Sequence, residues 1–451
     1  MNTDFVVMVR QTHHEWHCIL SLRRERSSEL TPKTQSNACR RISRTIVRIT
    51  KFIIMQNQST TTVVNNNTSK AHALKFIVLL GIVSLFADIT YEGARSINGP
   101  YLALLGASAT TVGIVAGFGE LIGHSLRLVS GYISDRIGRY WAITLFGYTL
   151  NMLAVPALAL AGRWEIAAVL IIMERIGKAI RTPARDAMLS HATKEIGRGK
   201  GFGLHEALDQ IGAVLGPLVV SGVLYFKGGY RTSFLTLLIP AFMAISVLMT
   251  ARWLYPQPRN LEVAQPELET KGFPKKFWLY VAAVALIAAG YADFPLIAYH
   301  FKKVSIVSDT WIPVFYAIAM GVDAIAALLF GYLFDRKGVS ILIIVSLFSL
   351  LFAPLVFLGG FTFALIGMAL WGMGMGAQES IMRAAIADMV PINRRGTGYG
   401  IFNTGYGIFW FLGSALMGVL YDISLISLIA FSVVAQLASI PLLILVKKNP
   451  G

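Results

Sequence analysis

The chain alternates long apolar stretches with short polar connections. We count about twelve stretches of roughly twenty residues, and each is long enough to cross the hydrocarbon core of a bilayer as a helix. They begin near Leu74, Thr111, Trp141, Glu165, Phe202, Thr232, Phe277, Trp311, Ser340, Phe361, Gly398 and Ile423. The pattern predicts an all-α integral membrane protein with twelve transmembrane helices.

One connection, residues 255–276, is longer than the others. It carries four prolines and mixed charges, a composition typical of a solvated linker. It separates residues 71–254 from residues 277–447, and six of the predicted helices fall on each side. We expect two six-helix bundles joined by a cytoplasmic linker.

Two segments of the first half return in the second half. Residues 131–139 and residues 331–338 share a Gly-Tyr opening, an Asp-Arg pair and a closing glycine. A longer match sets Arg198–Gly216 against Arg395–Gly413 with seven identities and no gap. Convergent glycine usage in membrane helices explains some of these matches, but it does not explain the arginines. The halves are therefore predicted to be pseudo-symmetric copies, as in many transporters, with a substrate site between them.

The composition agrees with a membrane protein and excludes an ordinary soluble domain. Hydrophobic residues make up 55% of the chain and charged residues only 14%, against about a quarter in soluble domains. The net charge of +16 comes mostly from basic residues on alternate connections and from the N-terminal tail. By the positive-inside rule, this bias places both termini in the cytoplasm of a multi-pass plasma membrane protein. We expect no nucleic-acid partner.

Residues 1–70 differ from the rest because they are polar and basic and contain no apolar span. We expect a disordered cytoplasmic extension. Met55 opens a polar stretch that runs directly into the first predicted helix, so a native start at Met55 fits the sequence as well as one at Met1. Both cysteines, Cys18 and Cys39, lie in this extension, which leaves no thiolate or redox site in the predicted helices. We expect no metal or other cofactor.

Ionisable residues lie inside several predicted helices of the first half, at spacings of three and four that place them on one face. Each costs about 2.5 to 3.5 kcal/mol to insert, so such residues usually mark a transport pathway or a buried ion pair. Asp88 and Glu92 are the main candidates for proton or cation coupling, with Arg95 as their modulator. Further coupling candidates are Arg175, Glu206 and Asp209.

A water-accessible cavity between the halves explains the other polar residues within the spans. Its predicted lining comprises Tyr91, Glu120, His124, Lys178, Arg181, Asp293, Glu379, Arg383, Asn403 and Tyr406. A carboxylate in such a cavity can bind a proton or a cationic substrate but not both at once, which is a physical basis for antiport. The alternative is that these acids and bases only neutralise one another as structural ion pairs.

The repeated loop segments resemble a known family signature. The matching positions are Gly131, Asp135, Arg136, Gly138 and Arg139 in the first segment, and Asp335 and Arg336 in the second. The first segment resembles motif A of the major facilitator superfamily, and the second is similar to the weaker echo of that motif. The resemblance extends over about residues 72–447 and implies the major facilitator fold.

In that family the aspartate of motif A packs against a helix end of the opposite half and stabilises the outward-open state. An acid is favourable at a helix N-terminus because of the helix dipole. The resemblance therefore implies conformational latches at Asp135, facing the helix start near Gly396, and at Asp335, facing the helix start near Gly199.

Two further segments resemble family motifs. Gly203, Gly212 and Gly216-Pro217 resemble motif C of proton-coupled drug antiporters, although its closing glycine pair is absent here. Glycines allow close helix packing, and the proline kinks the helix. Arg175 matches the arginine of motif B, which in the family influences proton transfer.

We therefore predict a secondary active transporter that exports a small organic compound in exchange for protons. One alternative is a proton symporter that imports a small anionic metabolite, with Lys178 and Arg181 as the anion site. Another is a membrane sensor that has lost transport. No enzyme is expected, because the spans hold no evident nucleophile–base pair and the chain has no G-x-x-x-x-G-K-[S/T] loop. The expected partners are the substrate, protons and the lipid bilayer, and the family fold implies a monomer.

Overall fold

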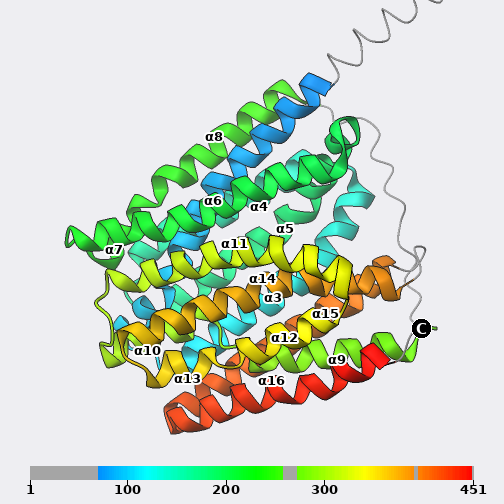
Figure 1. Ribbon diagram of the computed structural model, residues 1–451. Helices are drawn as coiled ribbons and strands as arrows, with labels where there is room; N and C mark the ends of the chain where they lie inside the picture. Colours follow the sequence, from blue (N-terminus) through cyan, green and yellow to red (C-terminus); the bar gives the residue numbers. More distant parts are fainter. Residues whose placement is uncertain (1–69, 257–271, 391–394, 449–451) are drawn as a thin grey trace, which may run out of the picture. The chain divides into compact units, whose positions relative to one another are not determined.

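The computed structural model describes residues 70–256, 272–390 and 395–448. Every regular element within these ranges is a helix (Figure 1). The elements are the first helix (Lys70–Leu104), α3 (Ala109–Ile137), α4 (Tyr140–Ala157), η1 (Leu158–Leu160), α5 (Trp164–Ile196), α6 (Arg198–Tyr225), α7 (Gly229–Thr236), α8 (Leu238–Leu254), α9 (Lys275–Gly290), α10 (Phe294–Val304), α11 (Trp311–Lys337), α12 (Ser340–Ser349), α13 (Phe352–Leu358), α14 (Phe361–Met389), α15 (Arg395–Ile423) and α16 (Leu425–Lys448). The extension before residue 70 and the middle of the linker, residues 257–271, lie outside the described residues.

Several membrane spans consist of two helical pieces. The pairs are α7 with α8, α9 with α10 and α12 with α13, and the short η1 extends α4. Counted in this way, 11 segments of the described chain are long and apolar enough to cross a membrane. The remaining long helix, α5, has 33 residues and is set apart by its ionisable side chains. The predicted all-helical membrane fold is confirmed, and α5 brings the count into agreement with the predicted twelve.

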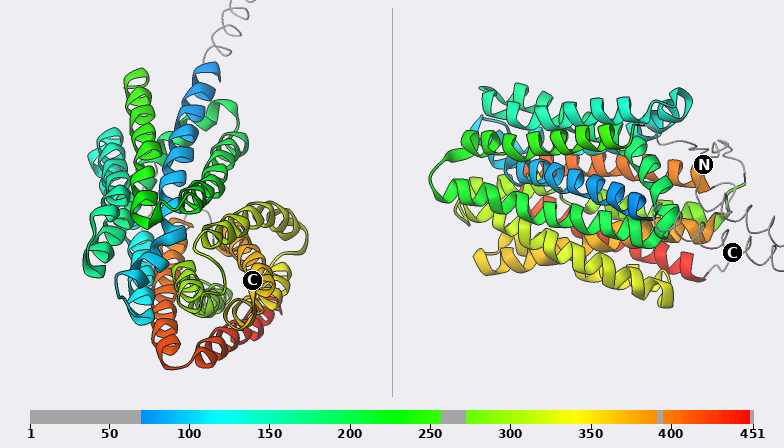
Figure 2. Two further views of the ribbon diagram at one scale, coloured as in Figure 1. Left: turned by 90° about the vertical axis from the view of Figure 1, so that its left-hand side faces the viewer. Right: turned by 90° about the horizontal axis from the view of Figure 1, so that it is seen from above.

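The helices pack first within each half and then between the halves. In the first half α3 and α4 pack on α5, and in the second half α9 packs on α16 and α11 on α14. Between the halves, α3 packs along α15 and α6 packs along α11. Figure 2 shows α3 in cyan beside α15 in orange when the helices are viewed end on.

The sequence repeat reappears in the packing of two glycines. Gly216 on α6 and Gly413 on α15 occupy matching positions of the repeat. A Cβ atom on Gly216 would lie 2.4 Å from the carbonyl oxygen of Ile89 in the first helix. A Cβ atom on Gly413 would lie 2.1 Å from the carbonyl oxygen of Ala289 in α9. Each glycine thus lets its helix approach the backbone of the helix that opens the same half.

The start of the first helix and the end of α16 lie at the same end of the packed helices (Figures 1 and 2). We call this the terminal end and the opposite one the distal end. Basic residues occupy the last turns of three helices that finish at the terminal end: Arg136 in α3, Arg336 and Lys337 in α11, and Lys447 and Lys448 in α16.

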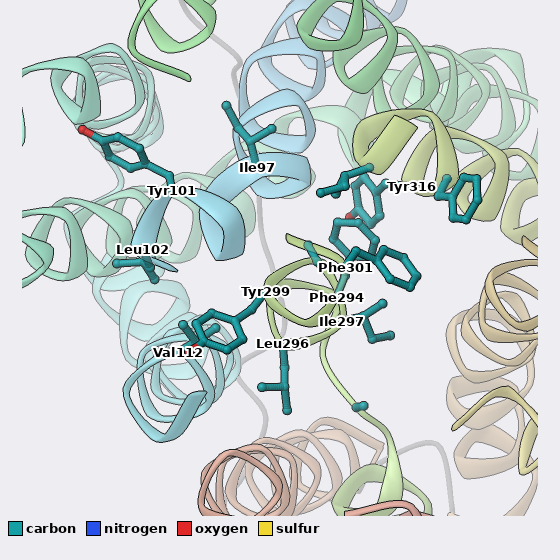
Figure 3. Packing of buried hydrophobic residues seen from close by; sticks show 14 of the residues in the cluster. Ile97, Tyr101, Leu102, Val112, Phe294, Leu296, Ile297, Tyr299, Phe301 and Tyr316 are labelled. Carbon is teal, nitrogen blue, oxygen red and sulfur yellow. The ribbon is translucent and has the colours of Figure 1, made fainter. Parts of the chain in front are cut away.

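Apolar packing between the halves seals the distal end. One buried cluster contains Ile97 and Tyr101 of the first helix together with Phe294 and Ile297 of α10 (Figure 3). The two helices approach closely because Gly99 has no side chain, and a Cβ atom there would lie 1.9 Å from the carbonyl oxygen of Pro295. Such dense packing leaves no aqueous route between these helices.

Candidate functional site

A polar cavity lies between the halves, on the terminal side of this seal. Its volume is about 160 Å³, close to the ~150 Å³ cavity that holds a benzene molecule in an engineered protein core. The first half contributes Tyr91, Glu92, Arg95, Glu120, His124, Arg127, Arg175 and Lys178, and the second half contributes Met375, Gln378, Glu379, Met382, Phe402, Asn403, Tyr406 and Trp410. Charged groups therefore concentrate on the first-half wall, and aromatic and thioether groups face them from the second half.

Glu120 of α3 is the centre of an ion cluster on the first-half wall. Its Oε1 atom lies 3.2 Å from Nη2 of Arg95 and 3.2 Å from Nη1 of Arg175. Arg175 also pairs with Glu174 at 3.4 Å, and Nε2 of His124 lies 3.9 Å from Oε2 of Glu120. Charges in a membrane interior are stable only when they are paired or hydrated, and this cluster pairs them across the first helix, α3 and α5.

Two polar contacts cross from the first half to the second beside the cavity. In the first, Nη2 of Arg95 lies 3.0 Å from Oδ1 of Asp293. In the second, the hydroxyl of Tyr316 donates to Oε2 of Glu92 at 2.5 Å. Within the second half, Nε1 of Trp410 donates to Oδ2 of Asp293 at 3.4 Å. Arg95 is 8% exposed and Asp293 is 1% exposed, so water screens this ion pair little.

Asp293 reaches Arg95 because the span that carries it is broken. Residues 291–293 are not helical and separate α9 from α10. Nε1 of Trp371 donates to the carbonyl of Ala292 at 2.9 Å, and the Tyr291 hydroxyl donates to the carbonyl of Trp371. Partners of this kind make a helix break tolerable inside a membrane, and such breaks often form binding sites in transporters.

Tyr91 lies among the cations of the first-half wall. Its hydroxyl accepts hydrogen bonds from Arg95, at 2.9 Å, and from Arg175. The ammonium nitrogen of Lys178 lies 3.6 Å from the centre of its ring, within cation–π range. Among the described residues no carboxylate forms an ion pair with Lys178, which leaves its charge facing the cavity.

The structure brings most of the predicted site residues to this cavity. The coupling candidates on its wall are Glu92, Arg95 and Arg175, and the predicted lining residues found there are Tyr91, Glu120, His124, Lys178, Glu379, Asn403 and Tyr406. Asp293 is joined to the wall through Arg95. The side chain of Arg383 lies outside the described residues.

Other predicted residues lie away from the cavity wall. Asp88 is 5% exposed and lies where the first helix meets α6. A Cβ atom on Gly212 of α6 would be 3.1 Å from the Cβ atom of Asp88. Arg181 is 1% exposed, and its guanidinium carbon lies 4.2 Å from the ring centre of Tyr148. Glu206 and Asp209 lie on α6, outside the cavity lining.

The second-half wall contains residues that the sequence analysis did not include. Met375, Gln378, Glu379 and Met382 lie on one face of α14, at positions i, i+3, i+4 and i+7. Their signal in the sequence was this stripe, from which the predicted lining took Glu379 but not Met375, Gln378 or Met382. Tyr406 donates to Oε1 of Gln378 at 2.9 Å, which ties α15 to α14.

The two repeated loop segments share a positive φ at their closing glycines. Gly138 has a φ of 66° and Gly338 a φ of 57°, values that favour glycine directly after a helix. The two backbones differ beyond this, because Gly138 is in the left-handed helical region with a ψ of 6° whereas Gly338 has a ψ of −149°. Arg136 donates to the hydroxyl of Tyr132 at 3.5 Å, and the guanidinium of Arg336 lies over the ring of Tyr332 at 4.4 Å. In each segment the glycine therefore ends its helix, and the arginine contacts the tyrosine one turn earlier in the same helix.

The predicted latch residues are exposed or partly exposed at the terminal end. Asp135 accepts a hydrogen bond from Tyr140, in its own half, at 3.1 Å. Asp335 and Arg139 are exposed. Gly199 and Gly396 themselves are among the positions whose burial and contacts lie outside the described part of the structure, so the latches remain predictions. Of the motif C glycines, Gly212 and Gly216 contact the first helix, whereas a Cβ atom on Gly203 would meet nothing within 4 Å.

Two pseudo-symmetric sets of helices around a central polar cavity are the architecture of a secondary transporter. The sequence matches the Major Facilitator Superfamily over residues 80–414 and over residues 281–450, and the chain belongs to this superfamily. The described residues contain no group of three His, Cys, Asp or Glu side chains that could hold a metal ion.

Known proteins resemble the chain over most of its length. An uncharacterized protein of Mycobacterium tuberculosis is 40% identical over 382 residues, which cover 83% of this chain and 93% of the relative. An MFS-type transporter of Methanocaldococcus jannaschii is 27% identical over 373 residues, covering 80% of this chain and 92% of the relative. The crystal structure of the nucleoside transporter NupG superposes with a TM-score of 0.68 at 14% identity and covers 81% of this chain and 99% of that one. This last likeness shows the fold alone.

Proposed function

We propose that the protein exports a small organic compound across the plasma membrane in exchange for protons. The observation that carries this proposal is the position of Arg95, which is shared by Glu120 of its own half and Asp293 of the other half. A proton on either carboxylate removes its negative charge and so weakens its ion pair with Arg95, which changes the contact between the halves. A cationic group of a substrate that approaches Glu120 has the same effect, so proton and substrate compete for one site.

The orientation follows from the distribution of charge. The basic helix ends at the terminal end belong in the cytoplasm under the positive-inside rule. In this orientation the cavity lies on the cytoplasmic side of the distal seal, where an exporter first receives its substrate. The partial resemblance to motif C supports exchange with protons rather than symport.

Proton movement in proteoliposomes tests the proposal. The full chain is reconstituted with a pH-sensitive dye inside the vesicles, a pH gradient is imposed, and lipophilic cations and small organic anions are added in turn. We expect an added cation to drive protons in the opposite direction, and we expect Glu120→Gln and Asp293→Asn to abolish this movement. Glu165→Gln is the matched control, because Glu165 is a partly exposed acid that pairs with Arg163 within one half.

The other outcomes would contradict the proposal in distinct ways. Protons that move together with an added anion would identify a symporter instead, and Lys178 supports this second candidate because it faces the cavity without an ion pair among the described residues. No response to any compound in folded, correctly reconstituted protein would favour a sensor without transport.

A further inference from the structure

We propose that Asp422 is an outer latch, which holds the distal end closed by capping the N-terminus of α3 from the opposite half. Asp422 lies in the last turn of α15, and α3 begins at Ala109. Its Oδ2 atom accepts a hydrogen bond from the backbone N–H of Thr110 at 2.9 Å and another from the Thr110 hydroxyl at 2.7 Å. One carboxylate oxygen therefore joins the two halves at the end where the apolar seal lies.

The chemistry of this contact favours a charged acid. The first N–H groups of a helix have no partner within the helix, and the helix dipole makes its N-terminus partly positive. Ser108 accepts from the N–H of Thr111, and Asp422 accepts from the N–H of the residue before it. The cap of α3 is thus assembled from both halves, and it is complete only while the halves touch at the distal end.

Small residues bring the two helices together for this contact. Gly418 lies one helical turn before Asp422, and a Cβ atom on it would be 2.6 Å from the carbonyl oxygen of Ala109. A Cβ atom on Gly113 would be 2.3 Å from the carbonyl oxygen of Ser414. The two helices therefore touch backbone to backbone just inside the latch, so a small separation of the halves breaks both hydrogen bonds.

The spacing of Gly418 and Asp422 repeats that of the loop segments at the other end of the molecule. Gly131 precedes Asp135 by four residues, and Gly331 precedes Asp335 by four residues, as Gly418 precedes Asp422. The predicted latches of the terminal end place an acid against the first turn of a helix in the other half. Asp422 is in such a contact at the distal end, so it is the distal counterpart of the predicted terminal latches and favours the opposite state.

Electron paramagnetic resonance distances test the latch without any substrate. Both cysteines of the full chain are replaced by serine, and spin labels are placed at Phe226→Cys and Leu358→Cys, which are exposed positions at the distal ends of opposite halves. Losing an N-cap changes an equilibrium by about 2- to 30-fold. We therefore expect Asp422→Ala to raise the population with a longer distal distance by a factor in this range.

Matched variants separate the latch from a general loss of packing. Asp422→Asn keeps an acceptor and should restore most of the parental distribution, and Glu165→Ala, which removes a distal acid paired within one half, should leave it unchanged. Gly418→Leu places a large side chain between α15 and α3 and should lengthen the distal distance further. An unchanged distal distance in Asp422→Ala would overturn the proposal. This result would not touch the proposed proton exchange, on which the experiment does not depend.

Discussion

Replacing Arg95 with methionine is expected to abolish transport and to destabilise the protein. The change leaves the carboxylate of Asp293, which is 1% exposed, without its cation, while Glu120 keeps Arg175. Breaking a buried ion pair from one side costs about 3–5 kcal/mol, which corresponds to more than about a 100-fold change in an equilibrium. Transport in proteoliposomes and thermal unfolding in detergent measure the two effects separately.

A double variant distinguishes a coupling role of this pair from a structural one. In Arg95→Met/Asp293→Asn no buried charge is left unpaired at this contact, so the unfolding temperature should return most of the way to that of the parent. Transport should remain lost, because no proton can then change the contact between the halves. Arg163→Met, at an exposed arginine that pairs with Glu165, is the control and should alter neither quantity. Parental transport by the double variant would show that the pair only supports the fold.

Gly99→Leu is expected to prevent closure of the distal end and so to stop the transport cycle. Even a Cβ atom at this position would lie 1.9 Å from a backbone carbonyl of α10, which cannot move away without shifting the helix. Inserting a side chain into a packed interface typically costs about 1–3 kcal/mol, and here the halves can avoid this cost by separating. We expect transport to fall at least about 10-fold.

The accessibility of the distal end shows whether this loss comes from failed closure. In a chain without native cysteines, a thiol at Ile97, which is buried in the seal, should react with a water-soluble reagent only when Gly99→Leu is present. Gly222→Leu is the matched control on α6, since a Cβ atom there meets nothing within 4 Å. Equal transport by Gly99→Leu and Gly222→Leu would mean that close packing at Gly99 is not needed.

The fold was predictable because its strongest signals are local in the sequence. Apolar length defines the spans, and the repeat from Arg198 to Gly216 defines the halves. The break at residues 291–293 was not predicted, because Gly290 and Pro295 are common in membrane helices and do not by themselves mark a break.

The site was more fully predictable on the first-half wall than on the second-half wall. Arg95, Glu120 and Arg175 stand out since charges in apolar spans are rare. Partnerships between the halves depend on contacts between residues far apart in the sequence, 224 positions for Tyr316 with Glu92 and 198 for Arg95 with Asp293. Arg181 was predicted to line the cavity and does not. It carries the same charge as Lys178 and lies on the same helix, but its guanidinium faces the ring of Tyr148 inside its own half.

The central claim is that the cavity opens in turn to each side of the membrane, and thiol accessibility at Asn403 tests it most directly. Asn403 lines the cavity, so Asn403→Cys in a chain without native cysteines reports which side reaches it. Oriented proteoliposomes are treated with a membrane-impermeant thiol reagent on one side, with and without a pH gradient. Phe226→Cys and Tyr132→Cys, which are exposed at the distal and terminal ends, verify the sidedness.

The account predicts that this cysteine reacts from the terminal side at equal pH. A proton gradient directed from the distal side should make it react from the distal side and should slow its reaction from the terminal side. Reaction from the terminal side alone under every gradient would contradict alternating access and would leave the cavity as a fixed pocket.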